Sequence, residues 1–284
     1  MQIVTFEKEG RAEPGVLIGG RVVGIRGAGF PDVLSVIAGG VEAAGRLKLW
    51  IDQARAADAP AVDAVKLLAP IPRPPKIICI GLNYRAHAAE SGATVPDVPT
   101  VFAKFHTAVN AHRQPIVLPK NSTQPDYEAE LAVVIGKGGR HVPEERWKEH
   151  VFGYTAFNDV SARDFQRATS QWVMGKTFDT FAPFGPAIVT ADEIADPQAL
   201  DISLTLNGEV MQNSNTRDMI FPISKLIEHL SSVFTLEPGD IIATGTPPGV
   251  GFARKPPRWL RPGDEAVVRI AGLADLVNPV VAEQ

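Results

Sequence analysis

The chain has 284 residues, of which 45% are hydrophobic and 21% charged, a balance typical of a soluble globular protein with one large domain or one domain plus a small appendage. A net charge of −4 argues against nucleic acid as the main partner, because such binding needs clustered Lys and Arg. No apolar stretch approaches the roughly 18 residues of a membrane span and no signal peptide is visible, so we expect a cytoplasmic protein with no membrane partner.

Residues 1–70 differ in pattern from the rest of the chain. Short β-like runs at Gln2–Phe6, Val16–Ile18 and Arg21–Ile25 precede an Ala-rich stretch of helical character, Val33–Val65. Four prolines then fall within residues 70–75. Proline fixes φ and stiffens the chain, so this segment is a plausible connector. We therefore expect a small N-terminal α/β domain over residues 1–70 and a main domain over residues 71–284.

The main domain is expected to consist mainly of strands. Apolar or partly alternating runs predict strands at Lys76–Ile80, Glu128–Ile135, Tyr154–Asn158, Asp240–Thr244 and Glu265–Ile270. The single cysteine, Cys79, lies in the first of these runs and is expected to be a buried, unreactive thiol.

A hairpin and a helix have the clearest local signals. Ile202–Leu206 and Glu209–Met211 are joined by Asn-Gly, which supplies the two positive φ angles of a type I′ turn. A helix is expected to begin at Pro222, because apolar residues then recur every three or four positions up to Val233. A shorter helix is expected from Pro143 to His150.

Three acidic residues form the strongest chemical pattern. Glu128 and Glu130 are two apart, so on a strand both carboxylates point to one face. Asp159 follows the strand that ends at Asn158. Three carboxylates suit a hard cation such as Mg²⁺ or Mn²⁺. An exposed Glu-x-Glu pair on an edge strand is the plain alternative, but the apolar flanks of this pair favour a buried strand.

A histidine and a glutamate form a second candidate pair. His87 and Glu90, three residues apart, share one side of a helix that would follow the strand ending at Ile80. A carboxylate beside an imidazole orients it and raises its basicity, as a general base requires. An exposed pair without a role is the alternative. The loop-like residues 91–99 could close over the site as a lid.

Three further polar residues are interesting only if they group with the acids. Arg163 and Gln166 follow Asp159 by four and seven residues, so a helix that starts near Ser161 would direct both toward the metal. Arg163 can bind a carboxylate with two hydrogen bonds, and Gln166 can donate to a carbonyl. Lys176 opens the segment Lys176–Pro186, which reads as an aromatic, proline-rich loop.

From Lys76 to its C-terminus the chain resembles the fumarylacetoacetate hydrolase family. Within this family it is similar to the fumarylacetoacetate hydrolase domain-containing proteins of mitochondria and bacteria. The resemblance rests on motifs in a fixed order: Gly81-Leu-Asn-Tyr-Arg-Ala-His87-Ala-Ala-Glu90, Asp126-Tyr-Glu128-Ala-Glu130, Asn158-Asp159-Val-Ser-Ala-Arg163-Asp164, Trp172-Val-Met-Gly-Lys176, Asn207-Gly208 and Thr244-Gly-Thr246-Pro-Pro-Gly249.

The resemblance implies an α+β, mainly β fold, namely a mixed β-sandwich roll with a small N-terminal domain, usually dimeric. It implies a magnesium or manganese site at Glu128, Glu130 and Asp159, and a catalytic pair at His87 and Glu90. Lys176 would neutralise oxyanion charge. The remaining positions that match substrate-contacting residues of the family are Arg163, Gln166 and Thr246.

These parts suit a small 2-oxo acid with a second carbonyl, because a chelated cation stabilises the enolate formed next to the 2-oxo group. We expect first C–C bond hydrolysis of an acylpyruvate such as fumarylpyruvate. Oxaloacetate decarboxylation or keto–enol tautomerisation is the next candidate. An isomerase or hydratase of aromatic catabolism comes third, and a non-catalytic metal-binding module last. The same site could serve several of these reactions.

Overall fold

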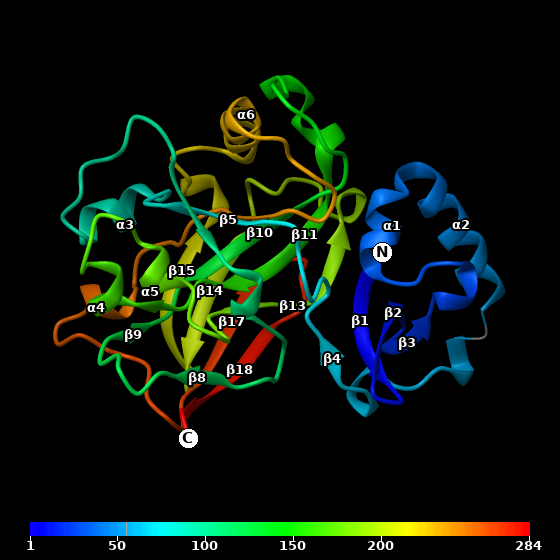
Figure 1. The fold of residues 1–284 in the computed structure, drawn as a ribbon, viewed down its shortest axis with the longest axis horizontal. Coiled ribbons are helices and arrows are strands. Elements are labelled where there is room, and N and C mark those ends of the chain that lie inside the picture. Colours follow the sequence, from blue (N-terminus) through cyan, green and yellow to red (C-terminus); the bar gives the residue numbers. More distant parts are fainter. Residues whose placement is uncertain (55) are drawn as a thin grey trace.

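A computed structural model describes residues 1–54 and 56–284 (Figure 1). The strands are β1 (Gln2–Lys8), β2 (Arg11–Ile18), β3 (Arg21–Gly24), β4 (Leu67–Leu68), β5 (Ile77–Gly81), β6 (Thr100–Lys104), β7 (Val109–Asn110), β8 (Ile116–Leu118), β9 (Pro125–Asp126), β10 (Ala129–Ile135), β11 (Val151–Asn158), β12 (Ser161–Ala162), β13 (Ala182–Thr190), β14 (Asp201–Leu206), β15 (Glu209–Asn215), β16 (Ile241–Ala243), β17 (Glu265–Ile270) and β18 (Leu276–Ala282). The α-helices are α1 (Val33–Ala38), α2 (Gly40–Gln53), α3 (Arg85–Glu90), α4 (Arg163–Gln166), α5 (Val173–Lys176) and α6 (Ile223–Val233).

Two mixed sheets form the body of the molecule. The larger follows the order β3-β2-β1-β13-β11-β10-β16-β5-β6, with β4 beside β1 and β7 beside β13, and the smaller follows β15-β14-β17-β18-β8. One hydrophobic core joins them, and it includes Leu131 of β10, Leu204 of β14 and Val268 of β17. Helix α6 adds its apolar side, with Leu226 and Leu230 buried in the same core. The expected mainly β sandwich is confirmed.

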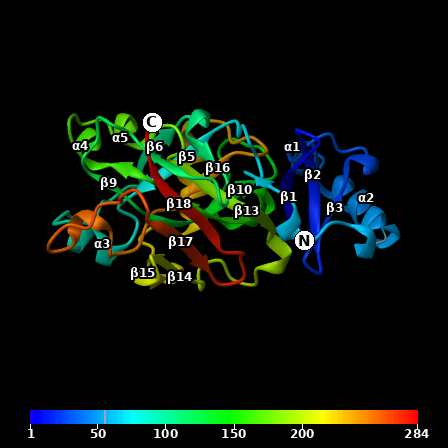
Figure 2. The ribbon, with the colours of Figure 1, turned by 90° about the horizontal axis from the view of Figure 1, so that it is seen from below.

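The N-terminal strands extend the larger sheet. Strand β1 pairs antiparallel with β13, and α1 and α2 pack over this end of the sheet through Ile37 and Leu47. These elements lie at one end of the elongated molecule, and α3, α4 and α5 lie at the other (Figures 1 and 2). The Ala-rich stretch forms α1 and α2, after which Ala56–Asp58 and Val62–Ala64 make only 3₁₀ turns. A domain boundary near residue 70 stays a prediction.

The segment from Lys176 to Pro186 differs from its prediction as a loop. Lys176 is the last residue of α5, and β13 starts at Ala182, so the second half of the segment is strand. Proline is normally excluded from a strand interior because it lacks an N–H. Here Tyr154 of β11 pairs with Val189 and Ala156 pairs with Gly185, so Pro186 lies in a local irregularity of the ladder where a missing donor is tolerated.

The strongest local signals are confirmed. Asn207 and Gly208 have φ angles of 53° and 83°, as a type I′ turn requires, and they join β14 to β15. The short helix expected after Pro143 is a 3₁₀ helix, Glu144–His150. Cys79 is a free, buried cysteine, and burial raises the pKa of its thiol. Within the described residues no helix combines the length and the apolar character needed to cross a membrane.

Candidate active site

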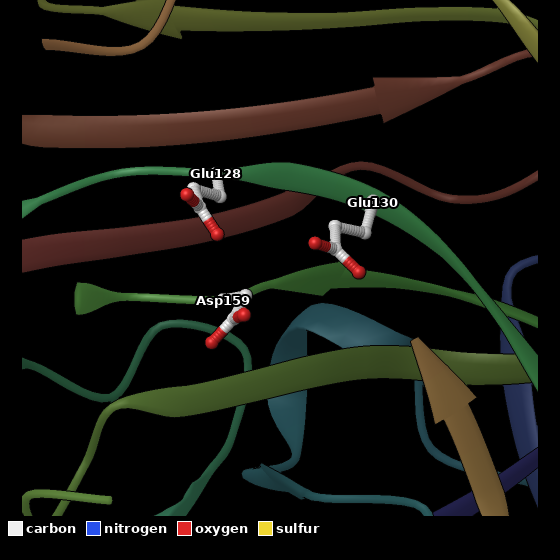
Figure 3. A group of neighbouring side chains, drawn as sticks. All are labelled: Glu128, Glu130 and Asp159. Carbon is white, nitrogen blue, oxygen red and sulfur yellow. The ribbon is translucent and has the colours of Figure 1, made fainter. Parts of the chain in front are cut away.

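The acidic group is positioned by two paired strand ends. Glu130 lies on β10, Glu128 immediately precedes this strand, and Asp159 immediately follows β11. Ala129 pairs with Asn158, so Glu128 and Asp159 face each other across the ladder, and the Asp159 N–H donates to the Glu128 carbonyl oxygen at 2.9 Å. One carboxylate oxygen from each acid lies within 4.8 Å of the others. Figure 3 shows the three carboxylates directed into one shared space.

Burial makes this acidic group costly unless positive charge lies beside it. Glu128, Glu130 and Asp159 are 5%, 1% and 0% exposed. Burial and the charges of Asp159 and Glu128 raise the pKa of Glu130 well above its ordinary value. Burial acts in the same direction on Glu128, but Arg163 and Lys176 outweigh it and hold the pKa of that carboxyl below its ordinary value. Three convergent carboxylates with a mutual repulsion to relieve fit one Mg²⁺ or Mn²⁺ ion.

Two buried lysines bind carboxylate oxygens of the acidic group. Lys176 donates to Glu128 at 2.6 Å and to Asp159 at 2.7 Å, and these charges raise the pKa of its ammonium group against the effect of burial. Lys104, at the end of β6, donates to Asp159 and, at 2.9 Å, to the Val160 carbonyl oxygen. Lys176 was expected near the acids from the sequence, whereas Lys104 was not. A lysine at a buried position of an alternating strand was the available signal, and only the strand order brings it to Asp159.

Arg163 connects the acidic group to its surroundings. Its guanidinium donates to Asp126 at 2.9 Å, to Glu128 at 2.6 Å and to the Gln166 side-chain oxygen at 2.9 Å. Asp126 is fully buried and also accepts from the backbone N–H groups of Gly251 and Phe252. Asp126 therefore fixes Arg163 and anchors the loop at Gly251 and Phe252. Its place in a sequence motif did not reveal this function.

The predicted histidine–glutamate pair is present on α3. His87 Nδ1 and Glu90 Oε1 are 2.7 Å apart, and the second oxygen of Glu90 accepts from the Gly249 N–H at 2.8 Å. His87 is buried and Glu90 half-buried. When Nδ1–H donates to the carboxylate, Nε2 is left as a free base. The pair is thus tied to the loop that carries Thr246.

Thr246 already uses its hydroxyl within the protein. It donates to the Ala129 carbonyl oxygen at 2.9 Å and accepts from the Gln212 side-chain amide at 2.8 Å. The neighbouring Gly245 N–H donates to Glu130 at 2.9 Å. This loop therefore stabilises the start of β10 and one metal-facing carboxylate, in addition to facing the cavity.

One cavity of about 150 Å³ collects most of these side chains. Its lining includes seven residues singled out from the sequence, and they are His87, Glu128, Glu130, Arg163, Gln166, Lys176 and Thr246. Glu90 and Asp159 are not part of the lining, but each is bonded to a residue that is. Four further lining residues were given no role from the sequence, and they are Phe102, Trp172, Phe252 and Arg167.

Comparisons with known proteins agree with this architecture. Residues 76–281 match the family described as fumarylacetoacetate (FAA) hydrolase, C-terminal. The chain is 50% identical over 219 residues to "Oxaloacetate tautomerase FAHD2A, mitochondrial" from Bos taurus, which covers 76% of this chain and 70% of that protein. It is 35% identical to a putative HpcE protein from Mycobacterium smegmatis, with a TM-score of 0.90 and full coverage of both chains. A maleylpyruvate hydrolase from Sphingobium sp. SYK-6, solved with manganese(II) and pyruvate, is 33% identical with full coverage of both chains and a TM-score of 0.84.

Proposed function

The chain belongs to the fumarylacetoacetate hydrolase family, whose enzymes act on small oxo acids, and within that class we propose that it is a divalent-metal-dependent oxaloacetate keto–enol tautomerase. The name of the bovine relative, at 50% identity, favours this reaction over the acylpyruvate hydrolysis that ranked first from the sequence. Family membership also sets aside the non-catalytic metal-binding module.

The observation that carries the proposal is that Glu128 and Glu130, two of the three grouped buried carboxylates, line one small cavity together with His87. A volume of about 150 Å³ suits a short-chain acid better than an extended one. Tautomerisation requires a proton to move between carbon and oxygen of the same substrate. A single positioned acid–base group beside a site for the developing negative charge is sufficient for that.

The residues suggest a division of labour. A bound Mg²⁺ or Mn²⁺, held by Glu128, Glu130 and Asp159, would supply Lewis-acid stabilisation of enolate charge. His87 Nε2 takes the proton from C3 of the keto acid and returns it to the 2-oxo oxygen, which yields the enol with no net loss of atoms. Glu90 keeps the imidazole in the tautomer that leaves Nε2 free.

Arg163 and Lys176 provide the positive charge around the substrate. Arg163 uses three of its five N–H donors on Asp126, Glu128 and Gln166, so two remain for a carboxylate. Lys176 lines the cavity between Glu128 and Asp159, where it can offset charge on the substrate oxygens. Gln166 keeps its amide N–H donors for a carbonyl.

The proposal is tested by following the decay of enol oxaloacetate in the ultraviolet, with Mg²⁺, with Mn²⁺ and with EDTA, while pyruvate and CO₂ are measured in the same samples. We expect metal-dependent acceleration of the enol–keto exchange without release of pyruvate. An exchange rate equal to the buffer rate in all three conditions contradicts the proposal. Stoichiometric CO₂ release would make the enzyme a decarboxylase.

Acylpyruvate hydrolysis remains the second candidate for two reasons. The His87–Glu90 pair can deprotonate a water as well as a carbon acid, and the Sphingobium relative is named as a hydrolase. Turnover of fumarylpyruvate and acetylpyruvate to pyruvate, faster than oxaloacetate exchange, would reverse the order of the two candidates.

Location and assembly stay predictions. We expected a cytoplasmic homodimer, whereas the bovine relative is named as mitochondrial. Cell fractionation and sedimentation of the purified protein at several concentrations decide these two points separately from the reaction.

A further inference from the structure

Four side chains that can carry positive charge line the cavity, and three of them have acidic partners. His87 is paired with Glu90, Arg163 with Asp126 and Glu128, and Lys176 with Glu128 and Asp159. The fourth, Arg167, forms no ion pair with any carboxylate in the part of the chain that the structure describes. It is exposed, so it lies at the rim of the cavity that the buried residues close from below.

Arg167 is nevertheless held in place. It follows Arg163 by four residues at the end of α4, so the two side chains share one side of the chain. Both guanidinium groups lie over the ring of Phe252, with their central carbons 4.6 Å (Arg163) and 4.4 Å (Arg167) from the ring centroid. The Phe252 N–H donates to buried Asp126 at 3.1 Å, which fixes the backbone that carries the ring.

This arrangement orients a positive charge without neutralising it. A cation–π contact stabilises a guanidinium from one side and leaves its N–H edge available. Burial and the charge of Arg163 lower the pKa of Arg167, which is what an unpaired cation beside another cation experiences. The N–H fork of arginine matches the geometry of a carboxylate.

We propose that Arg167 binds the second carboxylate of a dicarboxylic 2-oxo acid, and that it thereby makes the enzyme selective for dicarboxylates over monocarboxylates of equal length. The inference deepens the proposed function and rests on it for the position of the first carboxylate, near the acidic group and Arg163. The second carboxylate then lies at the rim, where Arg167 is the side chain that can pair with it.

The test compares two inert ligands, so that it does not depend on turnover. 2-Oxoglutarate and 2-oxovalerate have carbon chains of the same length. They differ at the far end, which is a carboxylate in 2-oxoglutarate and a methyl group in 2-oxovalerate. Their dissociation constants are measured by calorimetry on the full chain loaded with Mg²⁺, for the unaltered protein, Arg167→Met, Arg167→Lys and the control Arg261→Met. Arg261 is exposed and lies outside the cavity lining.

We expect the unaltered protein to prefer 2-oxoglutarate about 10-fold or more, since a hydrogen bond between charged groups is worth roughly that factor. Arg167→Met should remove the preference, Arg167→Lys should restore part of it, and Arg261→Met should leave it in place. Equal affinities for the two ligands in the unaltered protein, no detectable binding of the dicarboxylate, or a full preference in a folded Arg167→Met variant would each overturn the inference. Failure to tautomerise oxaloacetate would instead refute the proposed function, and the two results are read independently.

Discussion

The cavity has two sides that are built in different ways. The carboxylate floor consists of Glu128 and Glu130, which line the cavity, and Asp159, which is grouped with them. It lies at the paired ends of β10 and β11 and is held by the backbone ladder. The cationic wall (His87, Arg163 and Arg167) lies on the short helix α3 and at α4.

The wall is held by side chains that reach backbone N–H groups of the loop 244–252. Glu90 accepts from Gly249, and Asp126 accepts from Gly251. Short helices are not stable alone, so these bonds and the packing around them maintain the geometry. The difference teaches that binding of the cation depends on the sheet, whereas proton transfer and substrate selection depend on contacts between elements far apart in the chain.

The largest effect is expected from the floor. Glu130→Gln, or removal of the cation with EDTA, should lower tautomerase activity by about 10³-fold or more, because stabilisation of the enolate charge is worth several kcal/mol. Calorimetric titration with Mn²⁺ should show weaker binding in the variant, and exposed Glu209→Gln serves as the control.

Glu130→Gln should not lower the melting temperature of the cation-free protein, because the substitution removes a buried charge that its neighbours repel. Full activity in Glu130→Gln would exclude this residue from the cation site. It would also contradict the inference that the floor binds the cation.

A substitution in the wall should separate chemistry from cation binding. His87→Ala is expected to lose about 10²–10⁴-fold in kcat, the range typical of a general base, while Mn²⁺ binding stays as in the unaltered protein. His229→Ala, on the surface side of α6, is the matched control. Unchanged turnover in His87→Ala would remove this residue from the mechanism.

Glu90→Gln tests the support of that base. The glutamine keeps the shape and can still accept from Gly249, but it no longer holds the imidazole as a carboxylate does. We expect a loss of about 10–100-fold in kcat, in line with other partners that orient a histidine. A KM effect alone, with kcat unaltered, would indicate that Glu90 only shapes the cavity. Measuring the pH profile of kcat for both proteins completes the test.

The smallest effect is expected at the anchor of Arg163. Asp126→Asn leaves Arg163 bound to Glu128, so the guanidinium is loosened and not lost. We expect KM to rise about 10-fold, with kcat and cation binding close to unaltered values. A fall in kcat that exceeds the rise in KM would mean that Asp126 also positions His87 through the loop that ends at Phe252.

Much of the floor could be predicted from the sequence, and less of the wall. Alternation with a period of two places Glu128 and Glu130 on one face whatever the strand pairs with. The same local reasoning found the Asn207-Gly208 turn and α6, because turn chemistry and apolar spacing act over a few residues. It failed at β13, where the proline-rich segment Lys176–Pro186 was predicted as a loop, and only the irregular pairing with β11 makes Pro186 acceptable in a strand.

Local spacing and the family motifs both singled out His87, Arg163 and Lys176, but neither singled out Lys104 or Arg167. Lys104 is a single basic residue in a stretch without a chemical pattern, and Arg167 directly follows the candidate Gln166 but lies outside the quoted motifs. A lone lysine or arginine is usually a surface charge. Their importance comes from what lies opposite them. Asp159 faces Lys104, and Phe252 lies against Arg167.

The sequence by itself therefore determined which residues share a face and many of the strands, turns and helices, since those properties depend on neighbours along the chain. The tertiary structure decided which faces meet. The pairing of Ala129 with Asn158 brings Asp159 to Glu128, and the fold of loop 244–252 brings Phe252 between α3 and α4. Such contacts join residues about 30 to more than 160 positions apart. They contribute to stability only once the intervening chain has folded and the entropy cost of closing that loop has been met.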